Sequence, residues 1–210
     1  RAGEGVQLCL CGRERAKLED LATETGARAD VDVVDLLDAG AARGWENELA
    51  GRHGRVDALL HLVGGWRGGT SIEEAPLEDW DVLQDLLVRT VEHATQAFAP
   101  HLLASGRGRF VIVSSGQAQA PTKTNAAYAA AKAASEAWTL ALADRFRDSG
   151  ATANVVVVGS ILTPAMRADD PDKDFSKFTP AEEIAEAIAY LFSDAAASMN
   201  GQRLTMRGAS

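Results

Sequence analysis

The sequence predicts an α/β protein whose core is a doubly wound parallel sheet. Short apolar runs rich in β-branched residues alternate with longer amphipathic stretches from one end of the chain to the other. The predicted strands are almost wholly apolar, which is typical of strands that helices cover on both faces. No linker, repeat or low-complexity tract interrupts the 210 residues. We therefore predict one domain over residues 1–210.

Each element follows from its apolar pattern. Strands are expected where a short run is continuously apolar, and helices where apolar residues recur every three or four positions. The predicted strands are residues 6–11, 29–34, 56–63, 109–114, 153–158 and 203–206. The predicted helices are residues 14–25, 41–52, 77–104, 125–148 and 181–191. Gly26 is the expected stop of the first helix, and Thr179 and Pro180 are the expected N-cap and first residue of the last.

The composition limits the classes to which the protein can belong. Hydrophobic residues make up 46% and charged residues 24%, which is ordinary for a soluble globular protein. No apolar run approaches the ~20 residues of a membrane span, and no basic segment precedes an apolar leader, so we expect a cytoplasmic protein without a membrane partner. The net charge of −9 argues against nucleic acid, because phosphate binding needs clustered Lys and Arg. The abundance of Ala, Gly and Arg indicates a GC-rich bacterial genome.

The cysteines and histidines do not indicate a disulfide or a metal site. Cys9 and Cys11 lie close together in a predicted strand, where nearly parallel side chains are a poor geometry for a disulfide. We expect buried free thiols, as in a cytosolic protein. The histidines show no ligand spacing, and we predict no metal. They are His53, His61, His93 and His101.

Tyr128 and Lys132 form a motif that carries chemistry. They lie four residues apart within a predicted Ala-rich helix, so both side chains project from one face about a turn apart. A nearby ammonium favours the phenolate and can lower a tyrosine pKa from ~10 by roughly 1–3 units, towards the range of a useful general acid or base. An incidental surface pair is the alternative that the spacing alone leaves open.

Ser114 and Ser115 support the catalytic interpretation. They end a predicted buried strand at its carboxyl edge, which is where open α/β sheets bind ligands. Ser115 precedes Tyr128 by thirteen residues, and the loop between them is short enough to return the helix over the strand end. A hydroxyl beside a phenol can hold the oxygen of a carbonyl or an alcohol during hydride transfer. Taken alone, the serines would indicate no more than a turn.

Ser115, Tyr128 and Lys132 at these spacings resemble the catalytic serine and the Tyr-x-x-x-Lys pair of the short-chain dehydrogenases/reductases. Further segments resemble the same family in the same order along the chain. They are residues 54–57, 77–81, 106–111, 159–164, 179–185 and 193–202. The sequence is identified as a divergent member of the family's classical type. The resemblance implies a Rossmann-like three-layer sandwich.

The resemblance also implies a role for each of these residues. Tyr128 would transfer the proton, Lys132 would lower its pKa and bind ribose hydroxyls, and Ser115 would orient the substrate oxygen. Residues near the carboxyl ends of the strands would hold a dinucleotide. The implied cofactor-binding residues are Arg13, Asp35, Leu36, Val63, Gly64, Tyr128, Lys132, Gly159, Ile161 and Thr163.

Arg13 favours NADP(H) over NAD(H) as the cofactor. It follows the strand of residues 6–11, where an acidic residue would bind the ribose 2′-hydroxyl of NAD and an arginine suits the 2′-phosphate of NADP. No Asp or Glu occupies this strand end, and Glu14 already lies in the predicted helix. A solvated arginine at a helix start is the alternative.

The chain departs from the family at its beginning. The family's glycine-rich phosphate loop is absent, and residue 1 falls just before the strand that resembles the family's second. The family's first strand lies in the middle of the sheet, so its loss would leave buried backbone groups unpaired at roughly 1–3 kcal/mol each. We therefore expect about 30 further residues, with a strand and a glycine-rich turn, before Arg1.

Internal departures bear on activity. Residues 61–64 read His-Leu-Val-Gly where the family has Asn-Asn-Ala-Gly, and Leu87 stands where the family has the asparagine of a water-mediated proton relay. His61 could contact the cofactor, or it could be a core histidine whose hydrogen bonds are satisfied. Leu87 leaves the catalytic trio intact but puts the proton path in doubt.

The leading hypothesis is an enzyme that transfers a hydride between NADP(H) and a small carbonyl or alcohol substrate. The alternative is a catalytically idle dinucleotide-binding protein that serves as a sensor or a subunit. The acidic segment 166–178 is expected to cover the pocket as a solvated lid. The small residues of the helix at 125–148 permit close packing between subunits, and with the resemblance they imply a homodimer or homotetramer.

Overall fold

The computed structural model describes residues 5–25 and 29–206 of the chain. Gly26, the expected stop of the first helix, lies outside the described residues. The strands are β1 (Leu8–Gly12), β2 (Ala29–Val33), β3 (Ala58–His61), β4 (Arg109–Ser115), β5 (Thr152–Val158), β6 (Ser160–Leu162), β7 (Phe178–Pro180) and β8 (Arg203–Thr205). The helices are α1 (Arg15–Thr25), α2 (Ala39–His53), α3 (Glu78–Gln84), α4 (Thr90–Ala104), α5 (Ala126–Arg145), α6 (Pro164–Asp169) and α7 (Ala181–Phe192). Among the described residues, no helix is long and apolar enough to cross a membrane.

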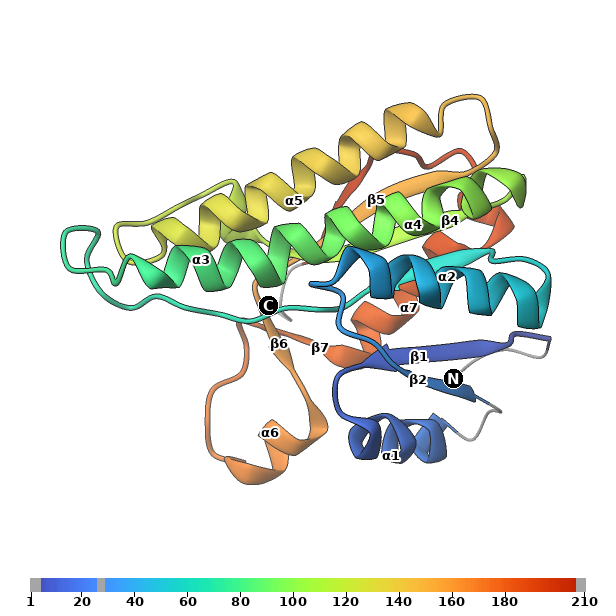
Figure 1. Ribbon diagram of the computed structural model, residues 1–210. Coiled ribbons are helices and arrows are strands. Elements are labelled where there is room, and N and C mark those ends of the chain that lie inside the picture. Colours follow the sequence, from blue (N-terminus) through green and yellow to red (C-terminus); the bar gives the residue numbers. More distant parts are fainter. Residues whose placement is uncertain (1–4, 26–28, 207–210) are drawn as a thin grey trace.

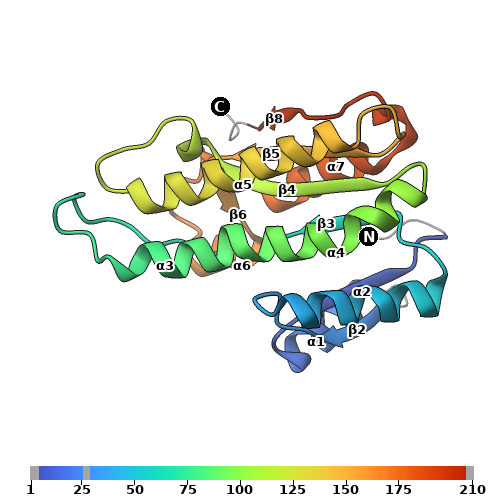
Figure 2. The same ribbon diagram turned by 45° about the horizontal axis from the view of Figure 1, so that its top comes forward.

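Parallel pairing and helices on both faces confirm the predicted fold. β3, β4, β5 and β8 form one parallel sheet in that order, and β1 pairs with β2 in parallel. Figure 1 shows α2, α4 and α5 on one side of the strands and α1 and α7 on the other. Figure 2 shows α4 and α5 lying side by side across β4 and β5. This is a doubly wound, three-layer α/β arrangement.

Apolar clusters hold the layers together. The larger cluster joins the strands to α2, α4 and α5, and in it the rings of Trp45 and Phe98 meet edge to face with their centroids 4.9 Å apart. Another cluster joins β4 and β5 to α7 through Val156, Ile184 and Leu191. Every residue of β5 is buried, which explains why the strand ends in four consecutive valines.

The strand pairing is interrupted between β1 and β3. In the part of the chain that the structure describes, β1 pairs with β2 and β3 pairs with β4, but β1 and β3 do not pair with each other. The interruption falls where the resemblance places an additional central strand, between the counterparts of the family's second and fourth strands.

The long helix predicted over residues 77–104 is divided by a π-helical turn, Asp85–Arg89, with α3 before it and α4 after it. Next to the turn, the Thr90 hydroxyl donates to the carbonyl oxygen of Leu86 at 2.7 Å. The turn carries Leu87 into a buried cluster with Ala131 of α5. Apolar periodicity did not predict this turn, because one such turn scarcely changes the spacing; π-turns are frequent at functional sites.

The region before α7 also differs from the prediction. Thr179 is not the N-cap of α7: it is a buried residue of β7, and Pro180 takes the N-cap position without a side-chain hydrogen bond. The short elements β6, α6 and β7 were not predicted, because segments of three to six residues carry no readable periodicity. β6 and β7 pair with each other although more than a dozen residues separate them in the sequence.

Candidate active site

Ser115, Tyr128 and Lys132 come together at the carboxyl edge of β4. Ser115 is the last residue of this strand, and the other two residues lie near the start of α5, which packs on β4 and β5. The loop between strand and helix is held by the buried side chain of Asn125. Its oxygen accepts a hydrogen bond from a backbone N–H of the loop (2.7 Å), and its amide donates to the side chain of Gln117 (2.7 Å).

The hydroxyl groups of Ser115 and Tyr128 are hydrogen-bonded to each other. Burial raises the pKa of Tyr128, and the hydrogen bond with Ser115 offsets part of this rise. The sequence-based expectation of a lowered pKa is wrong for this structure: the pKa is raised, because desolvation of the phenol is the largest effect on it. A phenol that is protonated at neutral pH can donate its proton to a carbonyl oxygen.

The Lys132 ammonium is buried between α5 and β4. The residue is 9% exposed, its Nζ donates to the carbonyl oxygen of Val113 (2.9 Å), and Nζ lies 5.9 Å from the centroid of the Tyr128 ring. Burial lowers the pKa of Lys132 to about 8, and the negative charge of Glu136 opposes this effect. An amine with this pKa gains and loses a proton readily in mildly basic solution.

The lowered pKa of Lys132 predicts a pH-dependent contribution to stability. The amine has a pKa of about 8 in the folded chain, whereas a free lysine has a pKa of about 10.4. Between these values the unfolded chain binds more protons, so the free energy of unfolding should rise with pH, by roughly 1–3 kcal/mol from this group. Urea unfolding of wild type and Lys132→Met from about pH 7 to 10 measures this. A stability difference between the two proteins that does not change with pH contradicts the prediction.

Glu136 belongs to this site and was missed by the sequence analysis. It lies one helical turn after Lys132 and is 1% exposed. One carboxylate oxygen accepts from the Ser114 hydroxyl (2.5 Å), and the other accepts from Gln119 Nε2 (2.6 Å) and Arg203 Nε (2.6 Å). The carboxylate thereby joins α5 to β4, to the turn after β4 and to β8. Its sequence signal is an acidic residue on the same helix face as Tyr128 and Lys132.

His61 is buried at the end of β3 with one unpartnered nitrogen. The residue is 6% exposed, and its Nε2 has no hydrogen-bond partner among the described residues. Burial, together with the nearby charge of Lys132, lowers the pKa of His61 to about 4, so the ring is neutral at pH 7.

The residues expected to bind a cofactor follow the carboxyl ends of the strands. They come after β1 (Arg13), after β2 (Asp35, Leu36), after β3 (Val63, Gly64) and after β5 (Gly159, Ile161, Thr163). The end of β2 is joined to α4, because His93 Nδ1 lies 2.9 Å from the carbonyl oxygen of Leu36. Thr163 caps α6 by accepting from the backbone N–H of Met166 (3.2 Å), which leaves its hydroxyl hydrogen free to donate to a ligand.

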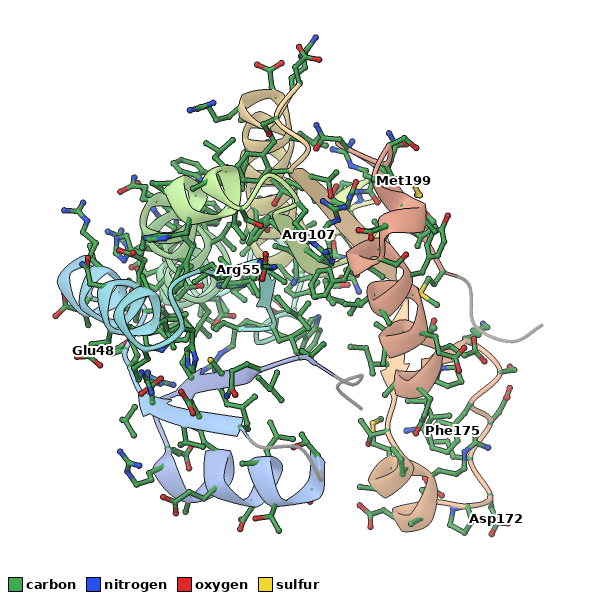
Figure 3. All side chains as sticks on the ribbon, turned by 90° about the vertical axis from the view of Figure 1, so that its right-hand side faces the viewer. Glu48, Arg55, Arg107, Asp172, Phe175 and Met199 are labelled. Carbon is green, nitrogen blue, oxygen red and sulfur yellow. The ribbon has the colours of Figure 1, made fainter. Side chains whose placement is uncertain are left out.

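Arg13 and Asp35 lie on the surface at the ends of β1 and β2. Arg13 is exposed and makes no hydrogen bond or ion pair with another residue in the described ranges. Asp35 is also exposed, and its carboxylate accepts from the backbone N–H of Leu37 (3.0 Å). It lines an open cavity of about 410 Å³ beside β2, whose lining includes Glu48 on α2 (Figure 3). None of the catalytic trio lines this cavity.

Cys9, Asp30 and His53 form a cluster that the sequence spacing did not indicate. Their potential ligand atoms all lie within 4.8 Å of one another. The Asp30 oxygen nearest to His53 Nε2 (2.8 Å) also accepts from Arg52 (3.0 Å), whose guanidinium bonds Asp32 as well (2.6 Å). Because the guanidinium occupies this carboxylate, we interpret the cluster as an ion-pair network that holds the end of α2 on β1 and β2. Both cysteines are free thiols, but they are partly buried and not fully buried as predicted.

The acidic segment expected to cover the pocket follows β6 and contains α6. The rings of Phe175 and Phe178 pack edge to face with centroids 5.2 Å apart, and Lys173 Nζ lies 5.6 and 5.9 Å from their centroids. Figure 3 shows Asp172 and Phe175 on this segment, away from the central strands. The segment thus has an aromatic cluster of its own besides its solvated charges.

Comparisons with known proteins identify related sequences. The family model described as enoyl-(acyl carrier protein) reductase matches residues 1–208. A relative from Thauera aromatica, (2S)-[(R)-hydroxy(phenyl)methyl]succinyl-CoA dehydrogenase subunit BbsC, is 30% identical over 99% of this chain and 85% of its own. Gluconate 5-dehydrogenase from Gluconobacter oxydans is 29% identical over 97% of this chain and 84% of its own.

Solved structures show the same fold. A gluconate 5-dehydrogenase from Burkholderia cenocepacia in complex with NADP and tartrate has a TM-score of 0.83 at 26% identity, over 95% of this chain and 83% of its own. An NADPH-bound short chain oxidoreductase from Pseudomonas aeruginosa, described as containing an atypical catalytic center, has a TM-score of 0.85 at 23% identity, over 96% and 86%. NAD+-bound xylitol dehydrogenase has a TM-score of 0.86 at 20% identity, over 98% and 89%. At 23% and 20% identity, the last two structures show similarity of fold alone.

The parallel sheet and the trio at its carboxyl edge define a Rossmann-like oxidoreductase. The family model covers nearly the whole sequence, and one relative reaches 30% identity over almost its full length. The chain belongs to the short-chain dehydrogenase/reductase family.

Proposed function

We propose that this protein is an enzyme that interconverts a carbonyl compound and an alcohol with NADP(H) as the hydride carrier. The observation that carries the proposal is the Ser115–Tyr128 hydrogen bond beside the buried ammonium of Lys132. A buried charge is costly to keep in a fold, and a group whose pKa is shifted by burial at a strand edge is typical of a catalytic site. Among the relatives, dehydrogenases and oxidoreductases support the same class of reaction.

The catalytic trio has distinct tasks in the proposed reaction. A bound cofactor supplies the hydride. Ser115 donates a hydrogen bond to the substrate oxygen and orients it, and Tyr128 donates its phenolic proton to that oxygen as the alcohol forms. The raised pKa of Tyr128 keeps this proton in place until it is needed. Lys132 stabilises the phenolate that remains and returns a proton to it; oxidation of an alcohol reverses each transfer.

The residues at the strand ends fit a phosphorylated dinucleotide. Arg13 offers an exposed guanidinium directly after β1, with no partner among the described residues, and guanidinium groups bind phosphate bidentately. Thr163 has a free hydroxyl hydrogen near the end of β5, and the partly exposed side chains of Val63 and Ile161 offer apolar surface. Related solved structures hold NADP in one case and NAD+ in another, so the preference for NADP(H) rests on Arg13.

Arg13→Ala should weaken NADPH binding by about 10- to 150-fold, because it removes a charge-assisted contact worth roughly 1.5–3 kcal/mol. NADH binding should change little, since NADH has no 2′-phosphate. Fluorescence titration of both cofactors measures the two affinities. Arg55→Ala is the matched control: it makes the same change in charge beside Asp57, at the amino end of β3 (Figure 3), and should leave both affinities unchanged. Equal losses for NADPH and NADH would show that Arg13 does not bind the 2′-phosphate.

A catalytically idle dinucleotide-binding subunit is the second candidate function. Leu87 and the His-Leu-Val-Gly segment at 61–64 favour it, and one relative is itself described as a dehydrogenase subunit. Measuring NADPH oxidation with each member of a broad panel of ketones and aldehydes distinguishes the enzyme from the idle subunit. Steady turnover of any member supports the enzyme. Tight NADPH binding without turnover of any member supports the subunit.

We also infer that the protein acts in the cytoplasm as a homodimer or homotetramer. The helices α4 and α5 lie side by side on one face of the molecule (Figure 2). On α5 the small residues Ala130 and Ala137 are exposed next to Trp138, so a second copy can approach closely. Sedimentation of the purified protein tests the assembly.

A further inference from the structure

His61 lies where β3 meets the helix layer that carries the catalytic lysine. Along β3, Leu59 and His61 are buried while the residues between and before them are exposed, so these two side chains face the same side. Leu59 packs in the cluster formed with α2 and α4. The His61 ring interacts with the backbone of Thr90 at the start of α4 and with the charge of Lys132 on α5. In the sheet His61 is the partner of Ile112, and the Lys132 ammonium donates to the carbonyl oxygen of the next residue, Val113 (2.9 Å), so the imidazole and the ammonium approach the same part of β4.

Within the described ranges, Lys132 has hydrogen-bond donors without an acceptor, and His61 has an acceptor without a donor. An ammonium has three N–H donors, and that of Lys132 uses one of them on the carbonyl oxygen of Val113. A neutral imidazole has one ring nitrogen that accepts, and His61 Nε2 is buried without a partner in the described chain. Buried polar groups of this kind are ordinarily paired through protein or internal water.

We propose that His61 is a positioning residue for Lys132, whose ammonium donates a hydrogen bond to His61 Nε2 through one internal water. This inference rests on the proposed function, in which Lys132 supports Tyr128. The ring must be neutral for this task, since a second cation beside Lys132 would repel the ammonium. Its low pKa keeps it neutral throughout the working pH range. Among the described residues, Tyr128 and Glu136 on the same helix are further titratable groups that interact with Lys132.

An acceptor for the ammonium stabilises the charged form of Lys132 and so raises its pKa above the value that burial alone would give. His61→Leu removes the acceptor. It should lower kcat by about 3- to 10-fold and move the basic limb of the pH–rate profile down by roughly half a unit to one unit. KM for the carbonyl substrate should change little. His61→Asn supplies an amide oxygen in place of Nε2. This variant should therefore have a kcat and a basic limb close to those of the wild type. Equal losses in the two variants, without a shift of the basic limb, would reduce His61 to a packing role.

A second measurement, made first on the wild-type protein, does not depend on turnover. In ¹⁵N NMR of the imidazole, His61 Nε2 should show the shift of an unprotonated, hydrogen-bonded nitrogen at pH 7. The signal should inflect near pH 8 as Lys132 loses its proton, and the inflection should vanish in Lys132→Met. The absence of an inflection in wild type would overturn the inference. An inflection in a protein that turns over no carbonyl would support the His61–Lys132 link and refute the proposed enzymatic function instead.

Discussion

Tyr128→Phe should slow carbonyl reduction by about 10²–10⁴-fold, which is the usual contribution of a positioned general acid. The substitution removes the phenolic oxygen that bonds to Ser115 and leaves the ring in its contacts with the apolar cluster of Leu83, Leu87 and Ala131. Because the proton moves only in the transition state, the loss should appear in kcat, while the affinity for NADPH stays close to that of wild type.

Tyr190→Phe is the matched control, because Tyr190 is the other of the two tyrosines in the chain and lies on α7 with 48% of its surface exposed. It should leave both turnover and NADPH affinity unchanged. Single-turnover rates with saturating NADPH separate the chemical step from product release. A Tyr128→Phe enzyme that reduces carbonyls at the wild-type rate would exclude Tyr128 as the proton donor.

The main elements of the fold could be predicted because their buried residues form readable apolar patterns. β5 illustrates this: all seven of its residues are buried, and its last four are consecutive valines, a run that no amphipathic helix would show. The short strands β6 and β7 could not be predicted in the same way. Each has three residues, and they are strands only because they pair with each other across the α6 segment. That pairing is a tertiary property that local pattern does not carry.

In the candidate site, too, local features could be predicted from the sequence and tertiary features could not. The spacing of Tyr128 and Lys132 on one helix face was readable, because it depends only on helix geometry. The direction of the Tyr128 pKa shift was not, because it depends on how deeply the phenol is buried. The partners of Glu136 and the lack of one at His61 Nε2 were not readable either, since both depend on contacts between elements far apart in the sequence.

Glu136 illustrates how these distant contacts support the site. Its carboxylate is nearly inaccessible to water, and its partners come from the end of β4, the turn that follows and β8. One of them, Ser114, directly precedes the catalytic Ser115, so the carboxylate helps to fix the strand end that carries this hydroxyl. A buried carboxylate with three donors is favourable only while its partners remain in place.

Glu136→Leu should lower the free energy of unfolding by about 3–4 kcal/mol, since it leaves a guanidinium and two polar side chains facing an apolar group. Arg203 is 42% exposed and can turn to water, so Ser114 and Gln119 account for much of the loss. Glu136→Gln keeps the shape and one acceptor oxygen and should cost only about 1–2 kcal/mol.

The exposed ion pair of Arg15 with Glu19 on α1 supplies the control for Glu136, since Glu19→Leu makes the same change in charge where water can compensate for it. It should cost less than about 1 kcal/mol. Urea unfolding of all three variants compares these losses. If Glu136→Leu costs no more than Glu19→Leu, the buried network contributes no net stability. In that case, hydrophobic replacement of the carboxylate would have offset its lost hydrogen bonds, as happens for some buried ion pairs.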